Sequence, residues 1–136
     1  MPHKFNVGGI SSNSTSSLDD NVRSEKEYNW DGLIGLITAT EYVKASTNNS
    51  CKSVSGTNCN NWLHFMNQNG EYNNIWTLTA TNNKARTYYI KGSSGDLVAS
   101  YVKTGAAVHP VFYLKPNLKF TQATGEKNNP YRIQSN

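Results

Sequence analysis

Residues 109–115 read HPVFYLK, and residues 124–133 read TGEKNNPYRI. The first stretch carries an apolar run that is typical of a β-strand. The second places Gly, Asn and Pro, which favour turns, before a short aromatic segment. This order of strand, turn and closing segment predicts the end of a compact β-rich domain.

More strands are expected on the amino-terminal side of this ending. Residues 74–81, NIWTLTAT, alternate β-branched and aromatic side chains, which favours a central strand in which Trp76 fills the core. Gly and Ser at 92–96 predict a hairpin turn. The remaining expected strands are 33–37, 88–90, 97–102, 107–114 and 131–133.

Short helices are expected in the first half of the chain. Thr38 and Glu41 have the spacing of a capping box, which predicts a helix through 41–45. A second helix is predicted from Asp19, with Asp19 or Asp20 as its N-cap.

The length of 136 residues suits one domain with one core. We expect residues 1–29 to be a polar amino-terminal segment or linker that contains the second helix, and residues 30–136 to form the domain. The predicted fold class is α+β, with short helices and an antiparallel β-sheet.

Three segments together resemble a known family: WDGLIGLITATEY at 30–42, CNNWL at 59–63 and HPVFYLK at 109–115. Their layout is similar to uncharacterised surface domains of low-GC Gram-positive bacteria, over roughly residues 30–133. The resemblance implies a C-type-lectin-like fold, as in formylglycine-generating enzymes. The family has an Arg where this chain has His109, so a bidentate hydrogen-bond donor is lost there.

Cys51 and Cys59 bracket a polar, turn-rich segment that contains no histidine. A local disulfide is the favoured interpretation, and two reduced thiols are the alternative. Closing so short a loop would stabilise the fold by about 2.5 kcal/mol on the chain-entropy model. Disulfides persist outside the cytosol, so the pair predicts an extracellular or cell-surface location.

The charge pattern argues against a nucleic-acid partner. The net charge of +4 is spread along the chain without a run of basic residues, whereas nucleic-acid-binding domains cluster such residues on one element. No apolar run is long enough to cross a bilayer, so we expect no membrane insertion by this segment.

Catalytic and metal-binding patterns are missing from the sequence. His3, His64 and His109 are far apart, the carboxylates are dispersed, and no known catalytic motif is present. Two cysteines at this spacing lack the second pair of ligands that a zinc site needs. We therefore expect no catalytic residue, no metal and no cofactor, and interpret the chain as a protein that is not an enzyme.

A recognition surface is instead predicted around residues 67–83. Calcium-dependent lectins use a carboxylate-Pro-Asn loop, but EYNNIW at 71–76 has no proline and one carboxylate, so a calcium-independent face is favoured. Amides there offer paired donors and acceptors, and in the alternative interpretation the asparagines only turn the chain. The candidate ligand-binding residues are Asn69, Glu71, Tyr72, Asn73, Asn74 and Asn82.

The sequence thus favours a non-catalytic recognition or adhesion module of a bacterial surface protein, with a glycan or a protein as ligand. The alternative is a structural subunit of a pilus or cell-envelope assembly, whose partners would be identical subunits.

Overall fold

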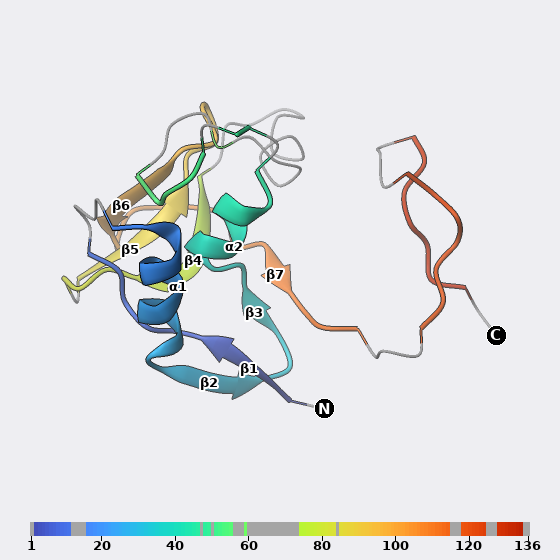
Figure 1. Cartoon of the computed structure of the whole chain (residues 1–136), viewed down its shortest axis with the longest axis horizontal. Helices are drawn as coiled ribbons and strands as arrows, with labels where there is room; N and C mark the ends of the chain where they lie inside the picture. Colours follow the sequence, from blue (N-terminus) through green and yellow to red (C-terminus); the bar gives the residue numbers. More distant parts are fainter. Residues whose placement is uncertain are drawn as a thin grey trace.

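The structure is a computed structural model that describes residues 2–11, 16–46, 48–49, 51–55, 59, 74–83, 85–114, 118–124 and 128–134. Figure 1 shows short helices packed beside small antiparallel sheets, so the α+β class and the combination of short helices with antiparallel strands are confirmed. The elements are β1 His3–Asn6, α1 Leu18–Lys26, β2 Asn29–Gly32, β3 Gly35–Leu36, α2 Ala39–Lys44, β4 Ile75–Ala80, β5 Arg86–Ile90, β6 Leu97–Tyr101 and β7 Pro110–Val111.

The largest sheet is an antiparallel meander in the order β4-β5-β6. The predicted turn between β5 and β6 is confirmed. Gly95 has a φ of 74° there, a backbone conformation that residues with a Cβ rarely adopt. Its amide donates to the Lys91 carbonyl over 2.8 Å, and its own carbonyl accepts a hydrogen bond from the Tyr42 hydroxyl. The turn is therefore fastened to helix α2.

Strand β4 buries one face and leaves the other partly open. Ile75, Thr77 and Thr79 are buried, whereas Trp76 and Leu78 are half-buried. Because successive side chains of a strand point to opposite faces, a buried Ile75 places Trp76 on the other side. The prediction that Trp76 fills the core is wrong. Its ring meets the Tyr89 ring edge-on, with the centroids 5.8 Å apart.

The core lies between this sheet and helix α2. Its fully buried members include Tyr42, Ile10, Ile75 and Ile90. Cys51 and Cys59 are joined by a disulfide, as predicted, and both are buried in the same cluster. The bond therefore anchors the segment after α2 to the core and does more than close a surface loop.

The first 29 residues contribute a strand and a helix. Strand β1 pairs with β2, and Phe5 and Ile10 are buried. The Ile10 amide donates to the Ala80 carbonyl, which ties this segment to the end of β4. At Gly8 the chain passes so close to α1 that a Cβ would overlap the Ser24 carbonyl oxygen. Only glycine fits at that crossing.

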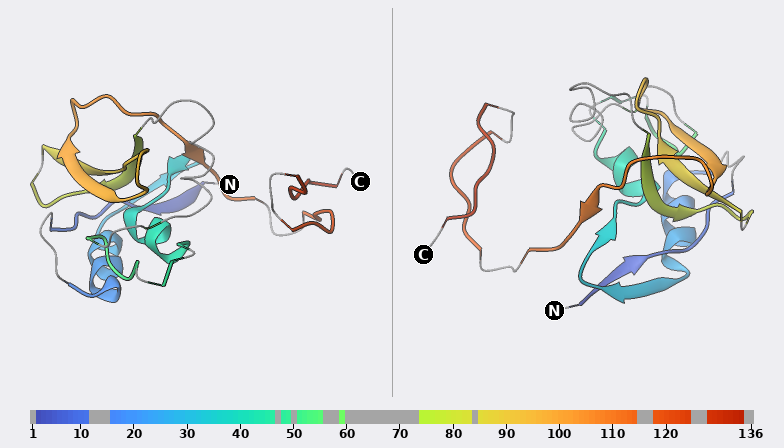
Figure 2. Two further views of the ribbon diagram at one scale, coloured as in Figure 1. Left: turned by 90° about the horizontal axis from the view of Figure 1, so that it is seen from above. Right: turned by 180° about the vertical axis from the view of Figure 1, so that it is seen from behind.

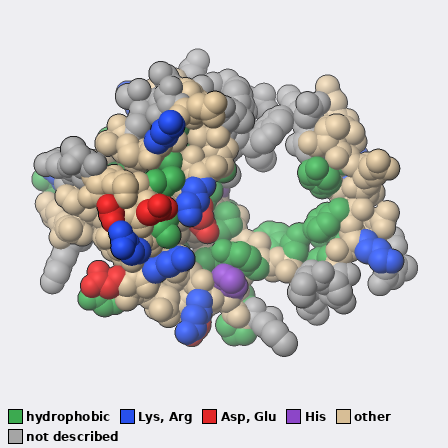
Figure 3. Space-filling view, viewed as in Figure 1, with side chains coloured by type: hydrophobic (Ala, Val, Ile, Leu, Met, Phe, Trp, Pro, Cys, Tyr) green, Lys and Arg blue, Asp and Glu red, His purple; other side chains and the backbone are tan. Residues whose placement is uncertain are grey.

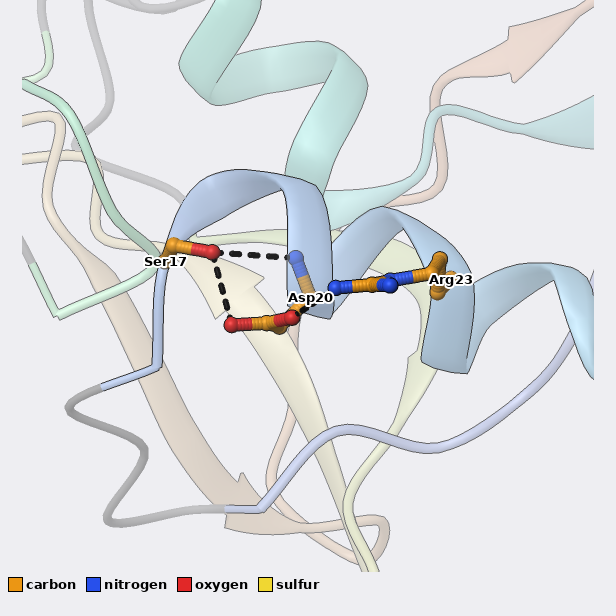
Figure 4. A network of polar contacts seen from close by, with 3 residues as sticks. All are labelled: Ser17, Asp20 and Arg23. Carbon is orange, nitrogen blue, oxygen red and sulfur yellow. Dashed lines mark hydrogen bonds and ion pairs between the residues drawn. The ribbon is translucent and has the colours of Figure 1, made fainter.

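The N-cap of helix α1 lies two or three residues earlier than its acidic side chains suggested. Ser17 is the N-cap, and its Oγ accepts a hydrogen bond from the Asp20 amide, so the predicted cap at Asp19 or Asp20 is wrong. Figure 4 shows the Asp20 side chain between Ser17 and Arg23. Asp20 forms an ion pair with Arg23. Asp20 therefore lies in the first turn, where a negative charge is favourable.

The chain leaves the body after β7, a two-residue strand that pairs with β3. Figures 1 and 2 show the following residues standing away from the sheets and folded back on themselves. We call residues 112–134 the C-terminal arm. Within it Phe120 forms an antiparallel bridge with Ile133. The segment predicted to pair at a sheet edge, 131–133, therefore pairs inside the arm.

Candidate recognition surface

Of the six predicted ligand-binding residues, the structure describes two, Asn74 and Asn82. Asn69, Glu71, Tyr72 and Asn73 lie outside the described residues, as does His64. Asn74 directly precedes β4 and Asn82 lies two residues after its end, so the length of the strand separates them.

Asn74 has a structural role. Its Oδ1 accepts a hydrogen bond from the Gly92 amide over 3.3 Å, and its carbonyl accepts one from the Ala107 amide over 2.6 Å. These bonds hold the β5–β6 turn and the chain before β7. Asn82 has an exposed side chain, and its amide donates to the Ile10 carbonyl. Asn74 is thus committed to the fold, while the Asn82 side chain faces solvent.

Another group of aromatic residues does come together. His3 and Tyr113 stack with ring centroids 3.4 Å apart, and Phe5 stacks on Trp30 with centroids 5.7 Å apart. Phe5 also contacts Tyr113 at 5.7 Å. We call His3, Phe5, Trp30 and Tyr113 the aromatic cluster. It joins strands β1 and β2 to the residues that follow β7.

The register of β1 and β2 explains the cluster. Phe5 is opposite Trp30 and His3 is opposite Gly32, so these four positions share one face of the two-stranded sheet. A Cβ at Gly32 would overlap the Trp30 ring, so the ring lies over the glycine. A Cβ at Gly35 would come within 2.5 Å of the Phe5 ring. The two glycines make the room that the rings occupy.

The cluster is buried at its base and open at its surface. Phe5 is 4% exposed, whereas Trp30 is 50% and Tyr113 is 54% exposed. Leu33 and Ile34, in the connection from β2 to β3, are 66% and 57% exposed, so the predicted buried strand 33–37 is reduced to β3. Figure 3 shows hydrophobic side chains gathered where the body meets the arm. Exposed apolar groups gathered in this way commonly mark a binding surface.

Glu41 adds a carboxylate close to the cluster. The Thr38 amide and hydroxyl both donate to Glu41 Oε2, at 2.9 and 3.0 Å, which confirms the predicted capping box. Partial burial, and then the negative charge of Glu41, raise the pKa of Tyr113. The Tyr113 hydroxyl and the Glu41 carboxylate therefore place polar groups beside the rings, as ligands with hydroxyl groups require.

A second polar group, Glu25, lies inside the protein. Its carboxylate accepts hydrogen bonds from the Thr40 amide at 3.2 Å, from the Thr40 hydroxyl and from the Thr79 hydroxyl at 2.5 Å. Thr79 Oγ1 in turn accepts from the Ala39 amide. Sequence reasoning missed Glu25, because no local pattern marks a surface-type residue whose partners are 15 and 54 residues away.

Neither a cluster of metal ligands nor a membrane-spanning helix is present in the described residues. No three His, Cys, Asp or Glu side chains among them are close enough to hold a metal ion. Within the same residues no helix has the length and apolar character needed to cross a membrane. His3 is part of the aromatic cluster, and His109 lies just before β7.

Comparisons of this chain with protein-family models, with curated proteins and with solved structures find no match.

The signal that would have pointed to the aromatic cluster is present but weak. Trp30 is followed two residues later by Gly32, and Phe5 lies in a short alternating segment, HKFN. Nothing local connects them to Tyr113, which is 83 positions after Trp30 in the sequence.

Proposed function

We propose that this chain is a non-catalytic recognition module that works outside the cell, and that the aromatic cluster is its ligand surface. The observation that carries the proposal is the pair of half-exposed rings, Trp30 and Tyr113, supported from below by the buried Phe5. In this proposal the chain is a variant of the C-type-lectin-like surface domains of low-GC Gram-positive bacteria that its sequence resembles.

A glycan is the ligand class that this surface suits best. Flat aromatic faces carry partial negative charge and stack on the C–H groups of a sugar ring, and large rigid rings lose little conformational entropy on binding. The Tyr113 hydroxyl and the Glu41 carboxylate supply polar partners for sugar hydroxyls. The Cys51–Cys59 disulfide supports an oxidising location such as the cell surface.

The test is binding of the intact chain to a glycan array, followed by titration calorimetry with the best ligand. We expect Trp30→Ala and Tyr113→Ala to weaken binding at least tenfold, since a stacked aromatic residue at the centre of an interface contributes about 2 kcal/mol or more. Tyr131→Ala, an exposed aromatic on the arm, is the matched control and should bind as the parent does. A chelator should not change the affinity.

Two results would reject the ligand surface. One is an array without any bound glycan. The other is parental affinity in Trp30→Ala and Tyr113→Ala proteins whose melting temperatures are unchanged.

The second candidate is a subunit of a pilus or envelope assembly, and the C-terminal arm favours it. Figure 2 shows the arm apart from the body in both views, and it carries several exposed apolar side chains. Outside the aromatic cluster these are Phe112, Leu114, Phe120, Tyr131 and Ile133. A second copy of the chain could cover them, as in other exchanges of an element between identical subunits.

Light scattering during size exclusion tests the assembly. If the arm docks on another copy, the parent forms dimers or larger species, and Phe120→Ser with Ile133→Ser shifts it to monomer. Val102→Ser, an exposed apolar residue after β6, is the control and should leave the mass unchanged. A parent that is monomeric at high concentration would argue against this candidate.

A further inference from the structure

A second charged and aromatic group lies on the β5–β6 hairpin. Arg86, the first residue of β5, is directly opposite Tyr101, the last residue of β6, so their side chains share one face. In Figures 1 and 2 this hairpin is on the side of the body away from the arm. The group is therefore separate from the aromatic cluster.

Two side-chain cations lie near the Tyr101 ring. The Arg86 guanidinium carbon is 4.5 Å from the centre of the Tyr101 ring, and its Nη2 donates to the Tyr101 hydroxyl over 3.3 Å. The Lys103 ammonium is 5.9 Å from the same ring centre. The ring face attracts both positive charges.

Two hydrogen bonds hold the backbone on either side of Lys103. The Val102 amide donates to the Ala85 carbonyl over 3.2 Å, and the Thr104 amide donates to the Tyr101 carbonyl over 2.9 Å. These bonds shape the turn that carries Lys103. Two like charges near one ring repel each other, and a bound anion would lower that electrostatic cost.

These cations lack acidic partners in the described part of the chain. The ion pair between Arg23 and Asp20 is the only one found there, so neither Arg86 nor Lys103 has a described carboxylate within 4.0 Å. The Arg86 Nε is buried and has no hydrogen-bond partner among the described residues. Because Nε is buried, the guanidinium offers an external oxyanion only its Nη1 and Nη2 donors, of which Nη2 also donates to the Tyr101 hydroxyl.

We propose that Arg86, Tyr101 and Lys103 form a binding site for an oxyanion of an acidic surface polymer, a carboxylate or a phosphate. The planar guanidinium, held in place by stacking on Tyr101, can donate two parallel hydrogen bonds to either group. Lys103 adds a mobile charge, and the Tyr101 hydroxyl lies beside the anion. The proposal does not depend on the aromatic cluster or its ligand.

Surface plasmon resonance with the intact chain tests the site. The probes are polygalacturonate for carboxylate, poly(glycerol phosphate) for phosphate and dextran as the neutral control. We expect binding to one or both acidic polymers at low salt and none to dextran. Whichever acidic polymer binds more tightly identifies the source of the anion. Because exposed charges are screened by salt, the affinity should fall as ionic strength rises.

Four variants distinguish binding at this site from binding that depends only on the net positive charge of the chain. Lys103→Gln and Arg86→Gln should each lower the affinity about tenfold, the effect of one charge-assisted hydrogen bond. Arg86→Lys, which keeps the charge but loses the planar fork, should recover only part of the loss. Lys91→Gln removes one exposed charge from the turn of the same hairpin and should change the affinity less than twofold.

Lys103 is exposed, so its variant keeps the test decisive even if Arg86→Gln does not fold. Equal losses in Lys91→Gln and Lys103→Gln would overturn the site, because net charge alone would then explain binding. So would equal binding to dextran and the acidic polymers, or tighter binding to duplex DNA than to either polymer.

Discussion

Glu25 and Thr79 are 54 positions apart in the sequence, yet the Thr79 hydroxyl donates to the Glu25 carboxylate over 2.5 Å in the middle of the protein. The same carboxylate accepts from the Thr40 amide near the start of α2. One side chain therefore joins helix α1, helix α2 and strand β4. It is almost fully buried, with its oxygens held by neutral donors.

Glu25→Ala should accordingly be one of the most destabilising substitutions in the chain. It leaves the Thr40 amide and two hydroxyls without their acceptor, and an unsatisfied buried donor costs about 1–3 kcal/mol. We expect a loss of about 3 kcal/mol or more in the free energy of unfolding. Urea titration followed by circular dichroism measures it. Glu27→Ala, an exposed residue after α1, is the control and should cost little.

The disulfide should contribute to stability through both chain entropy and packing. Cys51 and Cys59 lie in the core beside Val54, so reduction opens the loop and also frees two buried core residues. We expect Cys51→Ala with Cys59→Ala to cost about 2.5 kcal/mol from loop closure alone, and more if the core loosens. Denaturant melts of this variant and of the parent with and without a reductant provide the measurement. Identical melts in all three would contradict a stabilising bond.

Truncating Ile75 should destabilise the protein more than truncating Trp76, although Trp76 has the larger side chain. Ile75 is fully buried, and truncating such a residue costs about 2–5 kcal/mol. Trp76 is half-buried on the other face of β4 and has the edge contact with Tyr89. We expect Trp76→Ala to cost about 1–2 kcal/mol, less than Ile75→Ala. The comparison uses midpoints of urea unfolding. A larger loss for Trp76→Ala than for Ile75→Ala would show that Trp76 contributes more to the core than this structure indicates.

Local patterns predicted what local forces determine. The capping box of Thr38 and Glu41, the turn at Gly95 and the Cys51–Cys59 bond each depend on residues fewer than ten positions apart. Strand β4 was also found from alternation, but alternation cannot say which of its two faces is covered. That choice depends on α2 and the Glu25 network, so Trp76 was assigned to the wrong side.

The candidate sites depend on longer connections. Pairing of β1 with β2 brings Phe5 to Trp30, and pairing of β3 with β7 brings Tyr113 to Phe5. Neither pair of strands is connected by a tight turn, so no local sequence signal predicts the pairing. The predicted surface at residues 67–83 depended on the density of amides there, whereas Asn74, one of the described amides, accepts a hydrogen bond from Gly92 in the β5–β6 turn.

Alkaline pH should unfold the protein through its buried tyrosines. Burial raises the pKa of Tyr42, and the nearby Asp96 charge raises it further; burial also raises the pKa of Tyr88. The unfolded chain releases these protons near pH 10, whereas the folded state retains them to higher pH. The unfolded state then binds fewer protons at these two tyrosines, so the stability that they contribute is unchanged below about pH 10 and falls above it.

Tyr42→Phe isolates the contribution of one hydroxyl. At pH 8 it should cost about 1 kcal/mol, because the Gly95 carbonyl loses the hydrogen bond donated by Tyr42 over 2.8 Å. Between pH 10 and 11 the variant should lose less stability than the parent does, because the group that titrates is gone. Urea midpoints from pH 8 to 11 give both values, with Tyr131→Phe, an exposed residue, as the control. If the parent and Tyr42→Phe lose stability in parallel above pH 10, the buried Tyr42 hydroxyl is not the cause of the alkaline loss.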